Sequence, residues 1–233
     1  MGATTEETLA LLGVVPSRFR AAIWLGAGEG MRIGEVLGAE DGSRCVDPAR
    51  REVHVVQQLR SHKQAYGGFY LSPPKSGSVG DVDLDEAVAA AVAEHVREFP
   101  PGGVELLDIT RGTPDSGKPV ARRLVNLLVT DDLGRPIHDQ AWSKLWAGWR
   151  AAAGWPQEGT FHSLRHYFAT ELIAANVDPA DVQNALRHFS LRITLETYVH
   201  WWPKRDRRRN IISSALRAAA AGHGTAVAGL IRS

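Results

Sequence analysis

The chain has little cysteine, no long apolar run and almost no net charge. Its single cysteine, Cys45, cannot form a disulfide within the chain, so a reducing compartment is the expected location. No stretch approaches the roughly 18 apolar residues that indicate a membrane-spanning helix. The first residues, MGATTEETLA, lack the basic and apolar regions of a secretory signal. We therefore expect a cytoplasmic protein without a membrane partner.

The net charge of +1 conceals an uneven distribution of charge. Residues 203–210, PKRDRRRN, contain five Lys or Arg and one Asp, which leaves 22 basic and 25 acidic residues elsewhere. A basic block on a mildly acidic body can contact phosphates, and it can equally be a solvated helix face. The candidates for phosphate contacts are Lys204, Arg205 and Arg207.

The 233 residues, 44% of them hydrophobic, suffice for one large domain or two small ones with a true core. Apolar periodicity and capping residues indicate mostly helices. We expect helices capped by Thr4 or Thr5, over 17–28, 31–37 and 85–98, from His138 or Asp139 to about 153, over 161–175 and 179–187, around Tyr198, and from the basic block to about Ala221.

Strand-like patterns are confined to one region. Val53, Val55, Gln57 and Leu59 share one side of an extended run, and residues 69–72 and 82–84 form two more short strands around the turn PPKSGSVG. Residues 104–136 are hard to interpret and contain a loop, RGTPDSGKP. The predicted fold class is α+β, mainly helical, with a small antiparallel β-sheet.

The segment FHSLRHYFAT, residues 161–170, combines an imidazole with a guanidinium. His162 and Arg165 are three residues apart on a helix and share a face, and this pair suits an anionic oxygen such as that of a phosphate. The segment can also be an ordinary polar helix face. His162 and His166, four residues apart, have the spacing of a zinc chelate, but the segment lacks the HExxH glutamate and a third ligand.

Four segments together resemble the tyrosine recombinases of the phage integrase type. HSLRH resembles their H-x-L-R-H box, and RHFSLRITLETYVH, residues 187–200, resembles the box with a histidine ten residues before the tyrosine. GEGMRIGEVLGAED, residues 28–41, resembles their first arginine box. YLSPPKSGSVGDVDL, residues 70–84, resembles the β-hairpin that carries their lysine. The segments occur in the order of the family.

The resemblance implies an anion-binding set. Arg32 and Arg165 would hold the non-bridging oxygens of a scissile phosphate, and His188 would hydrogen-bond the same group. Glu35 matches an acidic residue that supports the site. Two fixed guanidiniums can stabilise the more negative pentacoordinate transition state without a metal.

The resemblance also implies the groups that move protons. Tyr198 would be the nucleophile, His162 would assist proton transfer at the tyrosine, and Lys75 would protonate the leaving 5′-oxygen. A phenol has an ordinary pKa of about 10, so it needs a base and a cationic environment to attack at neutral pH. The phosphotyrosine product resembles the original ester in energy, so rejoining requires no ATP and no cofactor.

Each of these residues also has a purely structural interpretation. Arg32 can pair with Glu35 three residues on, and Lys75 can be a solvated turn residue. Tyr198 can be a core aromatic, and His188 can cap a helix.

The chain departs from the family pattern at three places. Arg187 stands where the family has the glycine of Leu-Gly-His, and we expect it to contact DNA. The lysine hairpin lacks the arginine that usually follows. Residues 103–125 look like an insertion.

We therefore expect a catalytic domain over residues 1–210 and a C-terminal helix and tail over 211–233 that docks on a neighbouring subunit. The N-terminal domain with which relatives clamp DNA is expected to be absent. The partner would be double-stranded DNA, bound by a homotetramer at the nucleoid, with a monomer possible without DNA. The alternatives are a DNA-binding protein with lost catalysis, a type IB topoisomerase and a metal-dependent hydrolase, although we expect no metal.

Overall fold

The computed structural model describes residues 3–112, 120–202, 214 and 217. The chain divides into a compact unit that ends at Trp202 and a second unit that begins at Pro203. Lys204, Arg205 and Arg207 lie outside the described residues, as does nearly all of the predicted last helix and of residues 211–233. The helices and strands of the candidate site all belong to the first unit.

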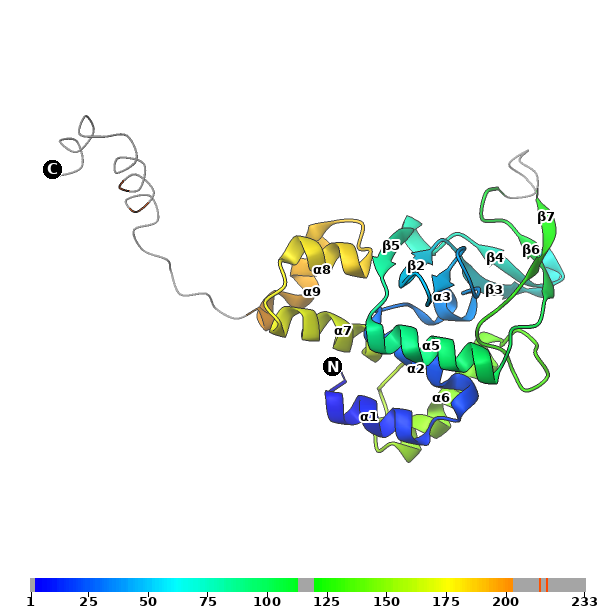
Figure 1. The fold of residues 1–233 in the computed structure, drawn as a ribbon, viewed down its shortest axis with the longest axis horizontal. Coiled ribbons are helices and arrows are strands. Elements are labelled where there is room, and N and C mark those ends of the chain that lie inside the picture. The colour runs from blue at the N-terminus through cyan, green and yellow to red at the C-terminus, as the bar shows by residue number, and fades with distance from the viewer. Residues whose placement is uncertain (1–2, 113–119, 203–213, 215–216, 218–233) are drawn as a thin grey trace. The chain divides into compact units, whose positions relative to one another are not determined.

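The described elements begin with helices, continue with short strands and two further helices, and end with helices (Figure 1). The helices are α1 (Thr5–Val14), α2 (Ser17–Gly28), α3 (Ile33–Leu37), α4 (Lys63–Tyr66), α5 (Glu86–Glu98), α6 (Asp139–Ala152), α7 (His162–Ala174), α8 (Pro179–Leu186) and α9 (Leu191–Tyr198), with 3₁₀ turns η1 (Lys75–Gly77) and η3 (Val199–Trp201). The strands are β1 (Val46–Asp47), β2 (Glu52–Val55), β3 (Gln58–His62), β4 (Gly68–Ser72), β5 (Gly80–Asp83), β6 (Val104–Asp108) and β7 (Ala121–Val125).

The helix boundaries follow from local capping chemistry, and this explains why the sequence predicts them well. The Thr4 hydroxyl accepts from the Glu7 amide at 3.2 Å, and the Glu7 carboxylate accepts from the Thr4 amide at 2.8 Å, so α1 begins with a capping box. Asp85 caps α5. Asp178 caps α8, whose first residue is Pro179.

The strands form two sheets instead of the single one that the sequence suggests. β1, β2 and β5 make an antiparallel sheet, in which Val53 lies opposite Val82. The other sheet has the order β3-β4-β6-β7, and its β4–β6 pair is parallel. The predicted run 53–59 is therefore divided between the sheets at Val56 and Gln57. The Gln57 side chain is buried there and donates to the Gly38 carbonyl at 2.6 Å.

The segment 104–136, which the sequence leaves unassigned, contains the antiparallel pair β6–β7. The residues of these two strands do not alternate regularly between apolar and polar types, because charged side chains point inward. Arg123 of β7 contacts Glu40 and Asp108, each at 2.6 Å. A partly buried arginine with two carboxylate partners breaks the apolar pattern by which a strand is recognised.

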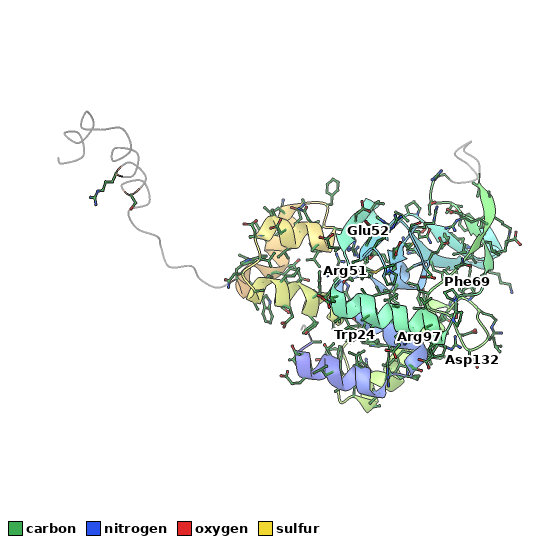
Figure 2. The ribbon with its side chains drawn as sticks, in the orientation of Figure 1. Trp24, Arg51, Glu52, Phe69, Arg97 and Asp132 are labelled. Atoms are coloured by element: carbon green, nitrogen blue, oxygen red, sulfur yellow. The ribbon has the colours of Figure 1, made fainter. Side chains whose placement is uncertain are left out.

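Buried apolar side chains form two clusters. The larger extends from helices α1, α2, α5 and α6 to the strands, with Trp24 on α2 and Phe69 on β4 packed at its margin (Figure 2). The smaller is built from Ala169, Ile173, Val182, Leu186 and Tyr198, and so joins α7, α8 and α9. Figure 1 shows these three helices at the opposite end of the unit from β6 and β7. The predicted mainly helical α+β fold class is confirmed.

Candidate active site

Arg165 is the buried anchor of the site. It lies on α7, and only 1% of the residue is exposed. Its Nη1 donates to the carbonyl of Gly30 and its Nη2 to the carbonyl of Leu186, so one side chain joins the start of α3 to the end of α8. Gly30 has φ +58°, and a Cβ there would come 2.6 Å from Phe168. A glycine is therefore needed where the backbone meets α7.

Glu35 holds two arginines at the edge of the site. Its carboxylate accepts from Arg32 Nη1 at 2.8 Å and from Arg187 Nη2 at 3.1 Å, and only 1% of its side chain is exposed. Burial alone would raise the pKa of Glu35, but Arg187, Arg32 and the Arg32 amide outweigh it, so the pKa lies below its usual range. Arg32 Nη1 also donates to Ser78 Oγ at 2.9 Å. The ionised carboxylate thus fixes both guanidiniums.

Arg187 does not have the geometry of the expected DNA contact. Its side chain is 2% exposed and pairs with Glu35, because the chain turns inward at the end of α8. Its backbone has φ 52°, the left-handed conformation for which glycine is suited. A residue other than glycine adopts this conformation at a cost in free energy. At Arg187 this cost occurs together with the ion pair to Glu35.

Tyr198 ends α9, with its ring in the smaller apolar cluster and its hydroxyl at a histidine. Tyr198 Oη lies 2.8 Å from Nδ1 of His166. The rings of His166 and His162 meet edge to face, with centroids 4.8 Å apart. The resemblance assigns proton transfer at the tyrosine to His162, but in this structure His166 contacts the hydroxyl, one helical turn further along α7.

His188 is held by a residue of the same sequence box. Its Nδ1 lies 2.8 Å from Oγ1 of Thr194, which is fully buried. Its backbone amide donates to the Gln183 carbonyl at 3.0 Å, so the main chain closes the end of α8. The imidazole is consequently available to face the site.

These side chains meet in one cavity of about 260 Å³. Its lining includes Arg32, Ser78, His162, Arg165, His166, Arg187, His188 and Tyr198. Lys75 is not in this lining. It is exposed on η1, the turn between β4 and β5, three residues before Ser78. The structure therefore brings together the predicted arginines, histidines and tyrosine, and leaves the predicted lysine outside.

Three contributors to the site are absent from the sequence-based set. Ser78 contacts Arg32, and Thr194 orients His188. His166 contacts the tyrosine hydroxyl. Their positions within the matching boxes offer a weak signal, because residues beside a motif are often ordinary packing residues.

The electrostatics of the cavity favour an anion. The Glu35 carboxylate lies among three guanidiniums, those of Arg32, Arg165 and Arg187. Burial, together with Arg32 and Arg187, lowers the pKa of Arg165 to about 9, so it stays charged at neutral pH. Burial and the neighbouring cations lower the pKa of His162 and of His188 to about 4, which keeps both rings neutral without a ligand.

Tyr198 is a poor nucleophile in the resting site. Burial raises its pKa to about 12, and the nearby Arg165 offsets only part of that shift. The hydroxyl is therefore protonated at neutral pH. The arrangement can hold an anionic ester between arginines, but attack on it requires removal of the phenol proton.

Among the described residues, no group of three or more His, Cys, Asp or Glu side chains has a metal-binding arrangement. None of the described helices is long and apolar enough to cross a membrane.

Comparison with known proteins shows what the chain resembles in sequence. The phage integrase family matches residues 107–205. A tyrosine recombinase XerC-like protein of Caldanaerobacter subterraneus subsp. tengcongensis is 25% identical, over 80% of this chain and 46% of that protein. Tyrosine recombinase XerC of Brucella suis biovar 1 is 28% identical, over 77% of this chain and 45% of that protein. The chain thus spans about half the length of the curated relatives it matches.

The fold comparison agrees. The Tn1549 transposon integrase (residues 82–397) in complex with circular intermediate DNA superposes with a TM-score of 0.68 at 20% identity, covering 94% of this chain and 67% of the other. This likeness defines the fold. Residues 107–205 thus match the phage integrase family, the chain has the fold of a tyrosine recombinase catalytic domain, and its sequence is similar to those of XerC-type tyrosine recombinases.

Proposed function

We propose that the protein is a site-specific DNA recombinase that cleaves and rejoins duplex DNA through a 3′-phosphotyrosyl bond to Tyr198. The observation that carries the proposal is the shared cavity, which is lined by three arginines, three histidines and Tyr198 from α7, α9 and the residues that flank α3 and α8.

The chemistry follows from the contacts. A scissile phosphate between Arg32 and Arg165 receives charged hydrogen bonds on its non-bridging oxygens, and His188 Nε2 supplies a further one. Tyr198 Oη forms a bond to phosphorus as the bond from phosphorus to the 5′-oxygen breaks. Glu35 and Thr194 contribute by fixing Arg32 and His188 before the substrate arrives.

Lys75 is proposed as the acid for the leaving 5′-oxygen. The turn that carries it reaches the cavity at Ser78, which contacts Arg32. A short rearrangement of this turn on bound DNA would bring Lys75 to the leaving oxygen. Without DNA the ammonium is exposed to solvent.

Double-stranded DNA is the proposed substrate, as in the Tn1549 integrase complex. We extend the proposal to a homotetramer on two duplexes, with residues 211–233 exchanged between subunits and Lys204, Arg205 and Arg207 at phosphates. A cytoplasmic protein that acts at the nucleoid is consistent with this substrate. We further propose that residues 1–210 form the catalytic domain and residues 211–233 a separate C-terminal segment.

The proposal is tested with a pool of random-sequence duplexes that carry a nick close downstream of the labelled strand segment. Cleavage releases the short 5′-hydroxyl fragment, so the covalent adduct accumulates and is seen on a denaturing gel. The expected result is a labelled adduct that Tyr198→Phe abolishes. Absence of any adduct, or an adduct that persists in Tyr198→Phe, would overturn the proposal.

The trapped sequences then distinguish the reactions. Recombination of two duplexes that carry the selected site supports a recombinase. Relaxation of supercoiled DNA without recombination would instead indicate a type IB topoisomerase. Activity that disappears with a chelator would indicate a metal-dependent hydrolase, and we expect no such loss.

A further inference from the structure

The hydroxyl of Tyr198 has one side-chain partner among the described residues, and it is His166. The Oη–Nδ1 distance of 2.8 Å is that of a strong hydrogen bond. The phenol is the donor if Nδ1 is unprotonated, which requires a neutral imidazole. Burial and the neighbouring Arg165 lower the pKa of His166, so the ring is neutral at pH 7. The phenol proton therefore already points at a free lone pair.

His166 also lies between two cavities. One is the 260 Å³ cavity with the arginines, and the other, of about 180 Å³, is bordered by α1 and by the loop before α7. His162 and His166 line both. Glu7 and Glu158 contribute to the lining of the smaller cavity. A proton that leaves the tyrosine thus has a route away from the phosphate.

The ring orientation agrees with that route. In the neutral ring Nδ1 accepts from Tyr198, so the ring proton is on Nε2. No hydrogen bond joins Nε2 to another described residue, and it is not among the enclosed unpartnered atoms of the described structure. Nε2 is therefore able to release a proton to solvent while Nδ1 takes one from the phenol.

We propose that His166 is a catalytic residue: the general base that removes the phenol proton of Tyr198 during strand cleavage and returns it during rejoining. The inference rests on the proposed function. In cleavage the Oη–phosphorus bond forms, the phosphorus–5′-oxygen bond breaks, the phenol proton passes to Nδ1, and the 5′-oxygen takes a proton from Lys75. In rejoining each step reverses. His162 then serves as the ring that packs against His166 and faces the phosphate.

The groups that face His166 set its behaviour on titration. They are His162 and Arg165 from α7, Tyr198 from α9, and Glu7 and Glu158 across the smaller cavity. Burial and Arg165 oppose protonation of the ring. Cleavage should consequently fall on the acidic side as His166 becomes protonated and can no longer accept.

Two substitutions separate a base from a residue that only positions the tyrosine. His166→Asn keeps an acceptor for the hydroxyl but cannot take a proton, and His166→Ala removes both. We expect single-turnover adduct formation, on a nicked duplex selected by the parent protein, to fall about 10²- to 10⁴-fold in both variants. We also expect the acidic limb of the pH profile to disappear in both. Added imidazole should restore part of the rate in His166→Ala only.

The outcomes are distinct. If His166→Asn cleaves within about threefold of the parent and keeps its acidic limb, His166 only positions the tyrosine and the proposal is overturned. The melting temperature of each variant shows that it is folded, and a ¹³C-tyrosine spectrum with a Tyr198→Phe reference reports the Tyr198 environment directly. Failure of the parent protein to form any adduct overturns the proposed function instead.

Discussion

The two regions that supply the candidate catalytic side chains differ in how firmly they hold those side chains in place. In the helical region, α7, α8 and α9 fix Arg165, His188 and Tyr198 through buried contacts. In the β-region, the turn after β4 presents Lys75 to solvent, outside the cavity lining. The anion-binding groups are thus preorganised, and the acid is not.

The difference has a physical reason. Groups that stabilise charge in a transition state act best when no reorganisation is needed. An exposed turn can instead move when the substrate arrives, so that the leaving group is protonated only when DNA is correctly placed. Substitutions in each region, and a change of pH, test whether the two regions differ in this way.

Arg165→Ala should have the largest effect, because it damages both stability and the site. Removal of the guanidinium leaves the Gly30 and Leu186 carbonyls without their donor, and charged hydrogen bonds of this kind contribute about 1.5–3 kcal/mol each. We expect adduct formation to fall more than about 10³-fold and urea unfolding to show a loss of about 3 kcal/mol. Arg165→Lys should recover part of the stability but little activity, because a lysine cannot span both carbonyls. Parent-like stability of Arg165→Ala would contradict the anchoring role.

Lys75→Ala should have a large effect on chemistry and almost none on folding. We expect cleavage to fall about 10²- to 10⁴-fold, with unfolding free energy within about 0.5 kcal/mol of the parent. A duplex whose leaving 5′-oxygen is replaced by sulfur should restore the rate, because a thiolate leaves without an acid. The neighbouring exposed Val79→Ala is the matched control and should cleave normally. If the sulfur substitution does not restore the rate of Lys75→Ala, Lys75 is not the acid.

Arg187→Gly should have a modest effect on stability. The change relieves about 1 kcal/mol of left-handed backbone cost but removes a buried charged hydrogen bond worth about 1.5–3 kcal/mol, so a net loss of about 1 kcal/mol is expected. Asn176→Gly is the matched control, since Asn176 has φ 62° and follows the end of α7 without such a pair. It should stabilise the protein. Equal stabilisation by both changes would show that the Arg187–Glu35 pair contributes nothing.

Acidification should weaken the DNA-free protein. His162 and His188 have a folded pKa of about 4, and an unfolded histidine titrates near 6.5. Between these values the unfolded chain binds more protons, so stability is present above pH 6.5 and is lost as pH falls toward 4. Sulfate, as an anion between the arginines, should reduce this loss relative to chloride at equal ionic strength.

Urea midpoints at pH 7 and pH 5 measure the effect, with the double variant His162→Asn, His188→Asn as control. His95 is buried against the Leu128 carbonyl, outside the cavity lining, and burial lowers its pKa. Its contribution should therefore survive in the double variant and should not respond to sulfate. An acid loss that is identical in the parent and the double variant, in sulfate and in chloride, would contradict the assignment.

The contrast between regions also explains how far the sequence can be interpreted. Thr4, Asp85 and Asp178 predict the starts of their helices because capping involves residues two or three apart. The apolar stripe of α7 predicts that helix. The β-structure depends on pairings between distant residues, such as Tyr70 with Leu107. No local pattern encodes such a pairing, so the sequence does not predict the division into two sheets or the β6–β7 pair.

Within the site, the residue types and their spacing are evident in the sequence: two arginines, a histidine one turn from an arginine, and a tyrosine ten residues after a histidine. The contact of His166 with the Tyr198 hydroxyl and the inward turn of Arg187 to Glu35 emerge only when the chain is folded. The physical reason is that His162 and His166 lie four residues apart on one helix face, which makes them equivalent in sequence. Which of them contacts the tyrosine depends on where α9 packs against α7.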